Sequence, residues 1–227
     1  MNKFKTILFD IDGTLLDFKA SEEEALEKVF AMHNYILDEH VKGTYERINK
    51  FLWEQYELGI IDRNMVIYSR FVKLFEELGI DGDGIRFEDE YQELLGEGHA
   101  LMDGAREVLE YLHPKYELYV VTNGVTRTQM KRLQDSKLKD YFKDIFVSEA
   151  TGYQKPMKEY FDYCFERIPN LDLSKTIIIG DSLSSDIQGG NNASVATCWV
   201  NPDSLDNKEK ISVDYEIKQL KELYSFL

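Results

Sequence analysis

Six short apolar runs, rich in β-branched and aromatic residues, constrain the fold of this chain more than any other feature. The runs lie at residues 6–9, 118–121, 145–147, 176–179, 196–200 and, more weakly, 213–217. Apolar residues at helical spacing predict helices between the later runs, at residues 105–112, 126–135, 158–167 and about 185–191. Strands that alternate with helices form parallel sheets covered on both faces, so the sequence predicts an α/β fold with a doubly wound parallel sheet.

A helical insert separates the first strand from the others. Its apolar residues follow helical stripes and predict four helices, of which the last runs over residues 87–95. Ser21, with Glu24 three residues later, predicts a capping box at the start of the first of these helices. We therefore expect a helical unit at residues 17–96, inserted into a core made of residues 1–16 and 97–227.

Most of the excess negative charge belongs to this insert. The 227 residues carry 27 Lys and Arg against 42 Asp and Glu, a net charge of −15. Residues 17–96 hold 9 of the basic and 19 of the acidic side chains, and so −10 of the −15. Because negative charge repels nucleic acid and anionic lipid, neither polymeric nucleic acid nor a membrane is expected as a partner.

The composition excludes further classes of protein. A hydrophobic content of 43% is too high for a disordered chain, and no apolar run reaches the roughly 20 residues of a membrane helix. Asp10 and Asp12 interrupt the first apolar stretch, so no signal peptide is expected. Cys164 and Cys198 are far apart and lack metal-binding spacing, which favours two reduced thiols in a cytoplasmic protein.

Polar motifs follow three of the predicted strands, and a fourth precedes a helix. Each has an ordinary explanation by itself, since Asp-Gly is a common turn and Asp-Ser can cap a helix. Ligands of parallel sheets bind at the carboxyl ends of the strands, where these motifs would converge. They are Asp10-Ile11-Asp12-Gly13-Thr14, Thr122-Asn123-Gly124, Lys155-Pro156, and Gly180-Asp181-Ser182 followed by Asp186.

The residue types in these motifs predict phosphoryl-transfer chemistry. Crowded carboxylates cannot all ionise unless a cation neutralises them, and oxygen ligands favour Mg²⁺. Thr122, Asn123 and Lys155 can donate hydrogen bonds to phosphate oxygens. One carboxylate can attack phosphorus and form an aspartyl phosphate, while a neighbour two residues away moves protons.

The four motifs, in this order, resemble those of the haloacid dehalogenase (HAD) superfamily, of its phosphatase kind. The resemblance implies a Rossmann-like core with a helical cap, Asp10 as nucleophile and Asp12 as general acid and base. It implies phosphate binding by Thr122, Asn123 and Lys155. Mg²⁺ would be held by the Asp10 carboxylate, the Asp12 backbone carbonyl and Asp181, with Asp186 as a ligand or a support. The dehalogenases lack an acid at the position of Asp12, so hydrolysis of carbon–halogen bonds is disfavoured.

A narrower resemblance concerns the substrate. Residues 180–190 and the sequence Cys198-Trp199-Val200-Asn201-Pro202 are similar to bacterial pyrimidine 5′-nucleotidases, which remove phosphate from nucleoside monophosphates, non-standard ones included. This implies a small phosphate ester, a nucleoside monophosphate, as the substrate. A sugar-phosphate phosphatase or phosphomutase of the same superfamily is an alternative. A receiver-like signalling domain is a third, disfavoured by Asp12 and by the long insert. The sequence predicts no oligomeric state.

Overall fold

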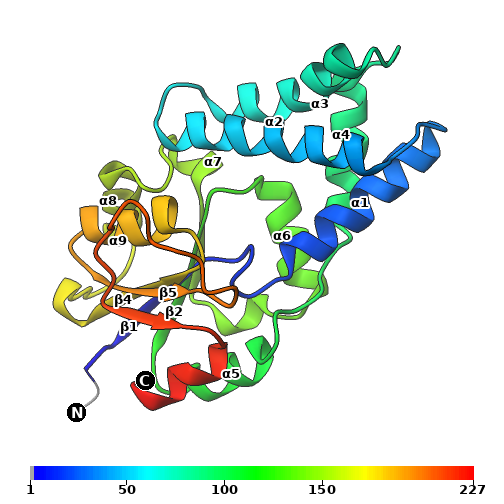
Figure 1. The fold of residues 1–227 in the computed structure, drawn as a ribbon. Helices are drawn as coiled ribbons and strands as arrows, with labels where there is room; N and C mark the ends of the chain where they lie inside the picture. The colour runs from blue at the N-terminus through cyan, green and yellow to red at the C-terminus, as the bar shows by residue number, and fades with distance from the viewer. Residues whose placement is uncertain (1–2) are drawn as a thin grey trace. The chain divides into compact units, whose positions relative to one another are not determined.

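The chain divides into two compact units. The computed structural model describes residues 3–227 (Figure 1). A core unit runs as far as Phe18 and resumes at His99–Leu227, and an insert unit comprises Lys19–Gly98. Each unit has its own hydrophobic interior, so they are described separately.

The core unit contains a six-stranded sheet in the order β3-β2-β1-β4-β5-β6. Every neighbouring pair of strands is parallel. The prediction of an α/β fold with a doubly wound parallel sheet is therefore confirmed. The strands are β1 (Thr6–Phe9), β2 (Glu117–Thr122), β3 (Asp144–Val147), β4 (Thr176–Gly180), β5 (Ala196–Val200) and β6 (Tyr215–Ile217).

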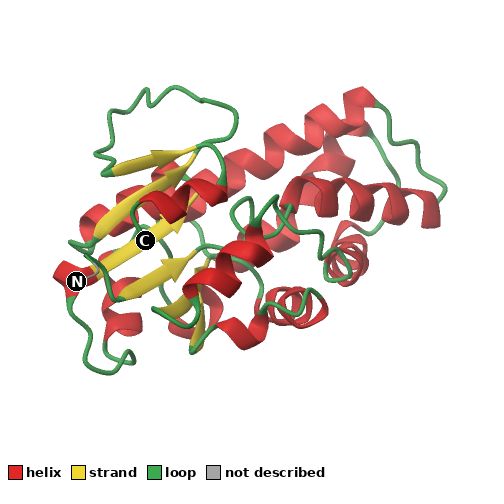
Figure 2. Cartoon of the chain, turned by 90° about the horizontal axis from the view of Figure 1, so that it is seen from below, coloured by secondary structure: helices red, strands yellow, loops and turns green. Residues whose placement is uncertain are grey.

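Alternate residues of the strands enter two different hydrophobic clusters, because successive side chains of a strand point to opposite faces of the sheet. On one face, Ile7 and Phe9 pack with the apolar residues of α5 (Ala105–Leu112) and η4 (Leu220–Ser225). On the other, Leu8 packs with those of α8 (Lys158–Phe165). Both faces of the sheet are thus covered by helices (Figure 2).

The remaining helical segments of the core unit are short, apart from α6, which follows β2. Two of them, a π-helical turn and α9, succeed each other directly after β4, where the sequence predicts one helix at about residues 185–191. These segments are α6 (Thr126–Asp135), η1 (Lys139–Tyr141), α7 (Ser148–Thr151), η2 (Leu173–Lys175), η3 (Leu183–Ile187) and α9 (Gln188–Asn192).

The insert unit is helical throughout its regular structure. Aspartates 38, 62 and 83 cap three of its helices through their side chains, and Gly79 ends the third in the left-handed conformation. Most of its aromatic residues are buried among the helices, as their spacing predicts. The helices are α1 (Phe18–Met32), α2 (Glu39–Glu57), α3 (Arg63–Leu78) and α4 (Gly84–Leu95).

The predicted capping box at Ser21 is wrong. The first helix of the insert begins at Phe18, and Ser21 is a buried residue inside it. Asp17 immediately precedes this helix, and its backbone N–H donates to the Ala100 carbonyl at 2.9 Å. The chain therefore leaves the core unit at a fixed point and turns into a helix at once, four residues before the local Ser-x-x-Glu pattern indicates.

Two predictions from composition concern thiols and membranes. Cys164 and Cys198 are both buried and form no disulfide. Burial raises the pKa of each thiol to about 12. Within residues 3–227, every helix is too short or too polar to span a bilayer.

Candidate active site

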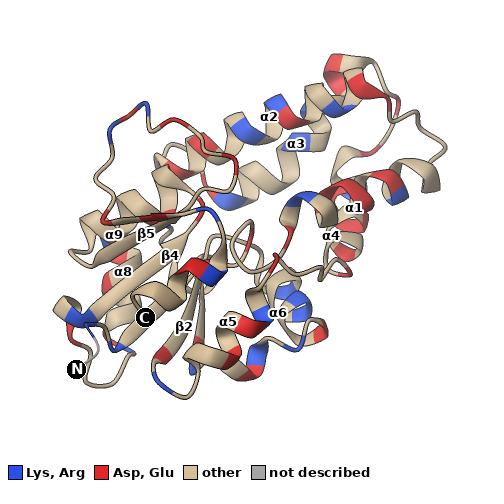
Figure 3. Cartoon of the chain, turned by 60° about the horizontal axis from the view of Figure 1, so that its bottom comes forward, with Lys and Arg blue, Asp and Glu red and all other residues tan. Residues whose placement is uncertain are grey.

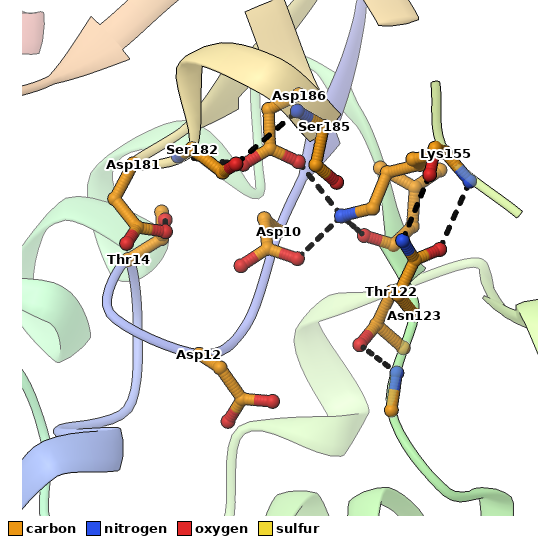
Figure 4. Close-up of polar contacts among 12 residues, drawn as sticks. Asp10, Asp12, Thr14, Thr122, Asn123, Lys155, Asp181, Ser182, Ser185 and Asp186 are labelled. Carbon is orange, nitrogen blue, oxygen red and sulfur yellow. Dashed lines mark hydrogen bonds and ion pairs between the residues drawn. The ribbon is translucent and has the colours of Figure 1, made fainter. Parts of the chain in front are cut away.

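The polar motifs gather where the direction of the strand order reverses. From β1 the chain adds β2 and β3 on one side of the sheet and β4, β5 and β6 on the other. Asp10 follows β1 directly, and Asp181 follows β4 directly, so both lie at the carboxyl edge beside this switch point. Ligands of open parallel sheets bind at such points. Figure 4 shows these residues with the labelled side chains of the other motifs around them.

A buried lysine joins two of the carboxylates. Lys155 Nζ donates to Asp10 Oδ1 at 2.6 Å and to Asp186 Oδ1 at 2.7 Å, and all three side chains are nearly inaccessible to solvent. Burial alone would lower the pKa of Lys155, but the carboxylates of Asp10 and Asp186 raise it. Burial also raises the pKa of Asp10 well above its usual range, against the opposing effect of Lys155. One ammonium is thus shared between two buried carboxyl groups.

Three carboxylates lie close enough to share one cation. Oxygens of Asp10, Asp181 and Asp186 lie within 4.8 Å of one another. Burial raises the pKa of Asp181 to about 7, and the charge of Asp186 adds to this effect. Oxygen-only ligands and crowded negative charge fit a hard divalent cation such as Mg²⁺. The side chain of Asp12 is not part of this group.

Glycines make the close approach of these carboxylates possible. Gly13 has a φ of +76°, and a Cβ at this position would lie 2.4 Å from Asp181 Oδ2. A Cβ at Gly180 would lie 2.2 Å from Asp186 Cγ. Only a residue without a side chain fits either position, because real Cβ atoms do not come so close to other atoms. The glycines of two motifs are therefore explained by the carboxylates that they admit.

The side chain of Asn123 positions Lys155. Asn123 Oδ1 accepts from the Lys155 backbone N–H, and Asn123 Nδ2 donates to the Lys155 carbonyl, both at 2.9 Å. Both ends of the amide are thus engaged by the backbone of one residue. A contribution of Asn123 to phosphate binding would therefore come from its backbone N–H. Its side chain fixes the backbone of Lys155, the residue that carries the ammonium.

Thr122 ends β2 with its hydroxyl oxygen already an acceptor of two hydrogen bonds. The backbone N–H of Gly124 donates to Thr122 Oγ1 at 3.1 Å, and Gln129 Nε2 donates to it at 3.0 Å. A hydroxyl has two acceptor sites and one donor. With both acceptor sites used, Thr122 Oγ1 can form a further hydrogen bond only as a donor, which is the role that a phosphate-binding hydroxyl needs.

Two residues that the sequence reasoning missed contact Asp12. Gln129 Nε2 donates to Asp12 Oδ2 at 2.5 Å, and Arg132 Nη1 donates to Asp12 Oδ1. Both side chains belong to α6 and are almost fully buried. Their separation of three residues places them on one face of that helix. That spacing, directly after Thr122-Asn123-Gly124, is the signal that could have identified them.

Further contacts hold the segment after β4. The Ser182 backbone N–H donates to Asp186 Oδ2 at 3.1 Å, and Ser182 Oγ accepts from the Ser185 backbone N–H at 3.2 Å. Trp199 of β5 is buried and donates from Nε1 to the Asp181 carbonyl at 2.8 Å. Trp199 thus helps to fix the backbone of a carboxylate in the candidate metal site.

The parallel sheet, the acidic cluster at its switch point and the lysine between the carboxylates define a class of hydrolase. Residues 4–194 match the family of haloacid dehalogenase-like hydrolases. This match covers most of the chain, and the chain therefore belongs to that family. Membership confirms the resemblance to the HAD superfamily and removes support for the receiver-like alternative.

Three bacterial relatives are similar over almost the whole chain. The HAD-hydrolase YfnB of Bacillus subtilis is 49% identical to this chain. The alignment covers 100% of this chain and 97% of YfnB. A crystal structure of YfnB bound to magnesium superposes on this structure with a TM-score of 0.94. The superposition covers 99% of this chain and 98% of the YfnB chain. Pyrimidine 5′-nucleotidase PynA of Streptococcus pneumoniae is 37% identical, with 99% of this chain and 95% of PynA covered. Pyrimidine 5′-nucleotidase YjjG of Escherichia coli is 31% identical, with 99% and 98% covered.

Proposed function

We propose that this protein is a Mg²⁺-dependent phosphomonoester hydrolase, a 5′-nucleotidase that acts on pyrimidine nucleoside monophosphates. The observation that carries the proposal is the cluster of Asp10, Asp181 and Asp186 around Lys155, with a second acid, Asp12, two residues from the first. The preference for pyrimidine nucleotides is supported by the similarity to PynA and YjjG.

In the proposed reaction, a carboxylate oxygen of Asp10 attacks the phosphorus of the ester. The bond from phosphorus to the leaving oxygen breaks, and Asp12 gives its proton to that oxygen, which releases the nucleoside. Asp12 then takes a proton from water as the water attacks the aspartyl phosphate. The bond from phosphorus to Asp10 breaks, so phosphate leaves and both aspartates return to their starting forms.

Other residues of the site would bind and orient the phosphate. The Thr122 hydroxyl and the backbone N–H of Asn123 would donate to phosphate oxygens. The three hydrogens of the Lys155 ammonium are engaged by Asp10, Asp186 and the Val121 carbonyl, so Lys155 would exchange one of these contacts for a phosphate oxygen. Asp10, Asp181 and the Asp12 carbonyl would hold Mg²⁺, with Asp186 as a ligand or as the support that also holds Lys155. The cation would offset the negative charge of the carboxylates and of the phosphate, which would otherwise repel each other.

The insert unit, Lys19–Gly98, is proposed to be the cap that selects the substrate. No base-recognising residue is assigned to it. A sugar-phosphate phosphatase would differ from the proposed function only in its substrate. A phosphomutase would also differ in the second step, because the phosphoryl group on Asp10 would pass to a sugar hydroxyl and no phosphate would be released. Substrate profiling by phosphate release therefore separates these functions.

The test is phosphate release from 4-nitrophenyl phosphate and from UMP, dUMP and TMP, with a panel of hexose phosphates in parallel. Activity should require Mg²⁺ and disappear in excess chelator, and Asp10→Asn should abolish it while the circular dichroism spectrum stays unchanged. Asp140→Asn, an exposed aspartate in η1, is the matched control and should retain full activity. Activity in the Asp10→Asn variant would refute the mechanism. Turnover of hexose phosphates with all three nucleotides inert would refute the nucleotidase assignment.

A further inference from the structure

Gln129 uses every polar atom of its side chain inside the site. Nε2 donates to Asp12 Oδ2 at 2.5 Å and to Thr122 Oγ1 at 3.0 Å, and Oε1 accepts from Arg132 Nη1 at 3.2 Å. The two hydrogens and the carbonyl of one buried amide are thus each engaged, which fixes the orientation of the amide. A single group thereby links the side chains of Asp12 and Thr122, which lie on different elements.

Arg132 completes the arrangement. Its Nη1 donates to Asp12 Oδ1 as well as to Gln129, so both oxygens of the Asp12 carboxyl are held from α6. The Phe18 ring lies 5.6 Å from Arg132 Cζ, and the guanidinium is buried. Each carboxyl oxygen has two acceptor sites, so a leaving oxygen or a water can still approach Asp12.

The glycine of the motif Thr122-Asn123-Gly124 makes room for this amide. A Cβ at Gly124 would lie 2.4 Å from Gln129 Nε2 and 2.7 Å from its Cγ. The start of α6 is itself tied down, since the Thr126 backbone N–H donates to Glu149 Oε2 at 2.7 Å. The position of the Gln129 amide is therefore determined by the chain on both sides of it.

From these contacts we propose that Gln129 and Arg132 are positioning residues that set the direction of Asp12 toward the leaving oxygen and, through Gln129, of the Thr122 hydroxyl toward the phosphate. The inference rests on the proposed function, because it assigns to Asp12 the proton transfer described there. It adds two residues outside the four motifs, and it gives Gly124 a role in catalytic geometry.

The experiment uses the dependence of the rate on the leaving group. An alkyl phosphate such as UMP needs a proton on its leaving oxygen, whereas 4-nitrophenyl phosphate has a good leaving group and needs it much less. A mispositioned Asp12 should therefore slow the two substrates unequally. The value to compare is kcat/KM, which reports the steps up to release of the leaving group.

In Gln129→Leu, kcat/KM for the alkyl ester should fall about tenfold to a hundredfold more than kcat/KM for the aryl ester, as part of the ~10²–10⁴-fold effect of general acid catalysis is lost. Asp12→Asn should show the same selectivity in stronger form. Gly124→Ala should show the same selective loss in a protein that keeps Gln129. Arg132→Lys should lose less of the kcat/KM for the alkyl ester than Arg132→Met does. Gln134→Leu, the same change at an exposed position of α6, should behave as the unmodified protein.

The inference would be overturned if Gln129→Leu and Gly124→Ala, both folded by circular dichroism, lost kcat/KM equally for the two esters. A residue with a merely structural role affects both esters alike, whatever their leaving group. Normal kinetics in both variants beside a selective loss in Asp12→Asn would also overturn the inference, and would leave the proposed function intact. Absence of hydrolysis of either ester by the unmodified protein would instead overturn the proposed function itself.

Discussion

Lys155 is the residue on which the charge balance of the site depends. Its ammonium lies between Asp10 and Asp186, and the three groups are buried together. Two carboxylates so close to each other repel, and burial makes that repulsion stronger than it would be in water. The lysine therefore has a structural function in the protein without substrate, besides its proposed contact with phosphate.

Replacing this lysine should destabilise the fold as well as abolish activity. Lys155→Met leaves two carboxylates buried without their partner, and breaking a buried ion pair costs about 3–5 kcal/mol. The free energy of unfolding from urea titrations at pH 7 should fall by about that amount. Added Mg²⁺ should recover part of the loss, since the cation neutralises the same carboxylates.

The matched control for this change is Lys158→Met. Lys158 is exposed and pairs with Asp162 one helical turn later, a contact of little energetic weight. Its replacement should change the urea midpoint only slightly. An equal loss in both variants would mean that the burial of Lys155 between carboxylates has no special weight.

Gly13 allows a second prediction with an internal control. Gly13→Ala combines a positive φ with a collision against Asp181, whereas Gly152→Ala has a similar φ of +78° and open space around it. Both should lose about 1–2 kcal/mol of stability from backbone strain. Only Gly13→Ala should also weaken Mg²⁺ binding, measured by calorimetry, because it displaces a proposed ligand. Equal magnesium affinity in the two variants would contradict this reading of Gly13.

The sequence could indicate which carboxylates meet, but not how they are held. Asp10 and Asp181 each follow an apolar strand, and the convergence of parallel strand ends is a general rule. The amide of Asn123 and the side chains of Gln129 and Arg132 take their roles from contacts across the fold. The spacing of Gln129 and Arg132 could indicate that they share a face of one helix, but their contact with Asp12 is evident only in the folded chain.

At the level of elements, a local rule fails where the insert begins. The Ser21–Glu24 pattern satisfies the capping rule, yet the helix starts at Phe18 because the preceding residues are fixed by the core unit. Asp62 and Gly79 lie within the insert itself, where no such constraint competes, and they bound α3 in agreement with the local rules for helix caps. Local capping signals are thus decisive only where the chain is free to follow them.

A buried ion pair joins two helices of the insert. Arg70 of α3 donates to both carboxylate oxygens of Glu88 in α4, at 2.7 Å and 2.6 Å, and both side chains are buried. Arg70 Nη1 also donates to the Asn49 side chain of α2 at 3.2 Å. Such a pair fixes the helices laterally, because a shift of either one would leave a charge unpaired in the interior.

Arg70→Leu should therefore destabilise the protein by about 3–5 kcal/mol, while the double variant Arg70→Leu/Glu88→Leu should recover a large part of the loss. The recovery follows because removal of both charges leaves neither member of this pair buried without the other. Urea unfolding followed by circular dichroism measures both. The Arg47–Glu77 pair, whose side chains are 60% and 48% exposed, is the control, and its removal should have little effect. A double variant as unstable as Arg70→Leu would refute the argument.

For the molecule as a whole, the excess negative charge is distributed unevenly along the chain, and the proposed cap carries most of it. Acidic residues are frequent along α1 and α4 of the insert (Figure 3), and the insert carries most of the net charge of −15. A polyanion is repelled by such a surface more strongly than a mononucleotide is, and salt screens the repulsion over about 10 Å at 0.1 M ionic strength.

We therefore expect 5′-phosphorylated oligonucleotides to be poor substrates at low salt, and better ones when the exposed Glu23, Glu24 and Glu27 of α1 are changed to Gln. Phosphate release from mononucleotides should change much less. Replacement of the same three residues by Asp keeps the charge and serves as the control. If oligonucleotides remain inert in the Gln variant, the shape of the substrate site, and not its charge, excludes them.

The two ends of the insert leave the core unit at the same place. Leu16 forms an antiparallel bridge with Leu101. The Met102 backbone N–H donates to the Leu15 carbonyl at 3.0 Å, and the Asp17 backbone N–H donates to the Ala100 carbonyl. The whole insert thus connects to the core unit as a single long loop whose two ends are paired with each other. The cost of closing a loop rises only with the logarithm of its length, so this connection tolerates inserts of very different sizes. We therefore expect that a helical unit from another protein with adjacent ends can be grafted here without disturbing the sheet, so that the proposed cap and the candidate active site can be exchanged separately.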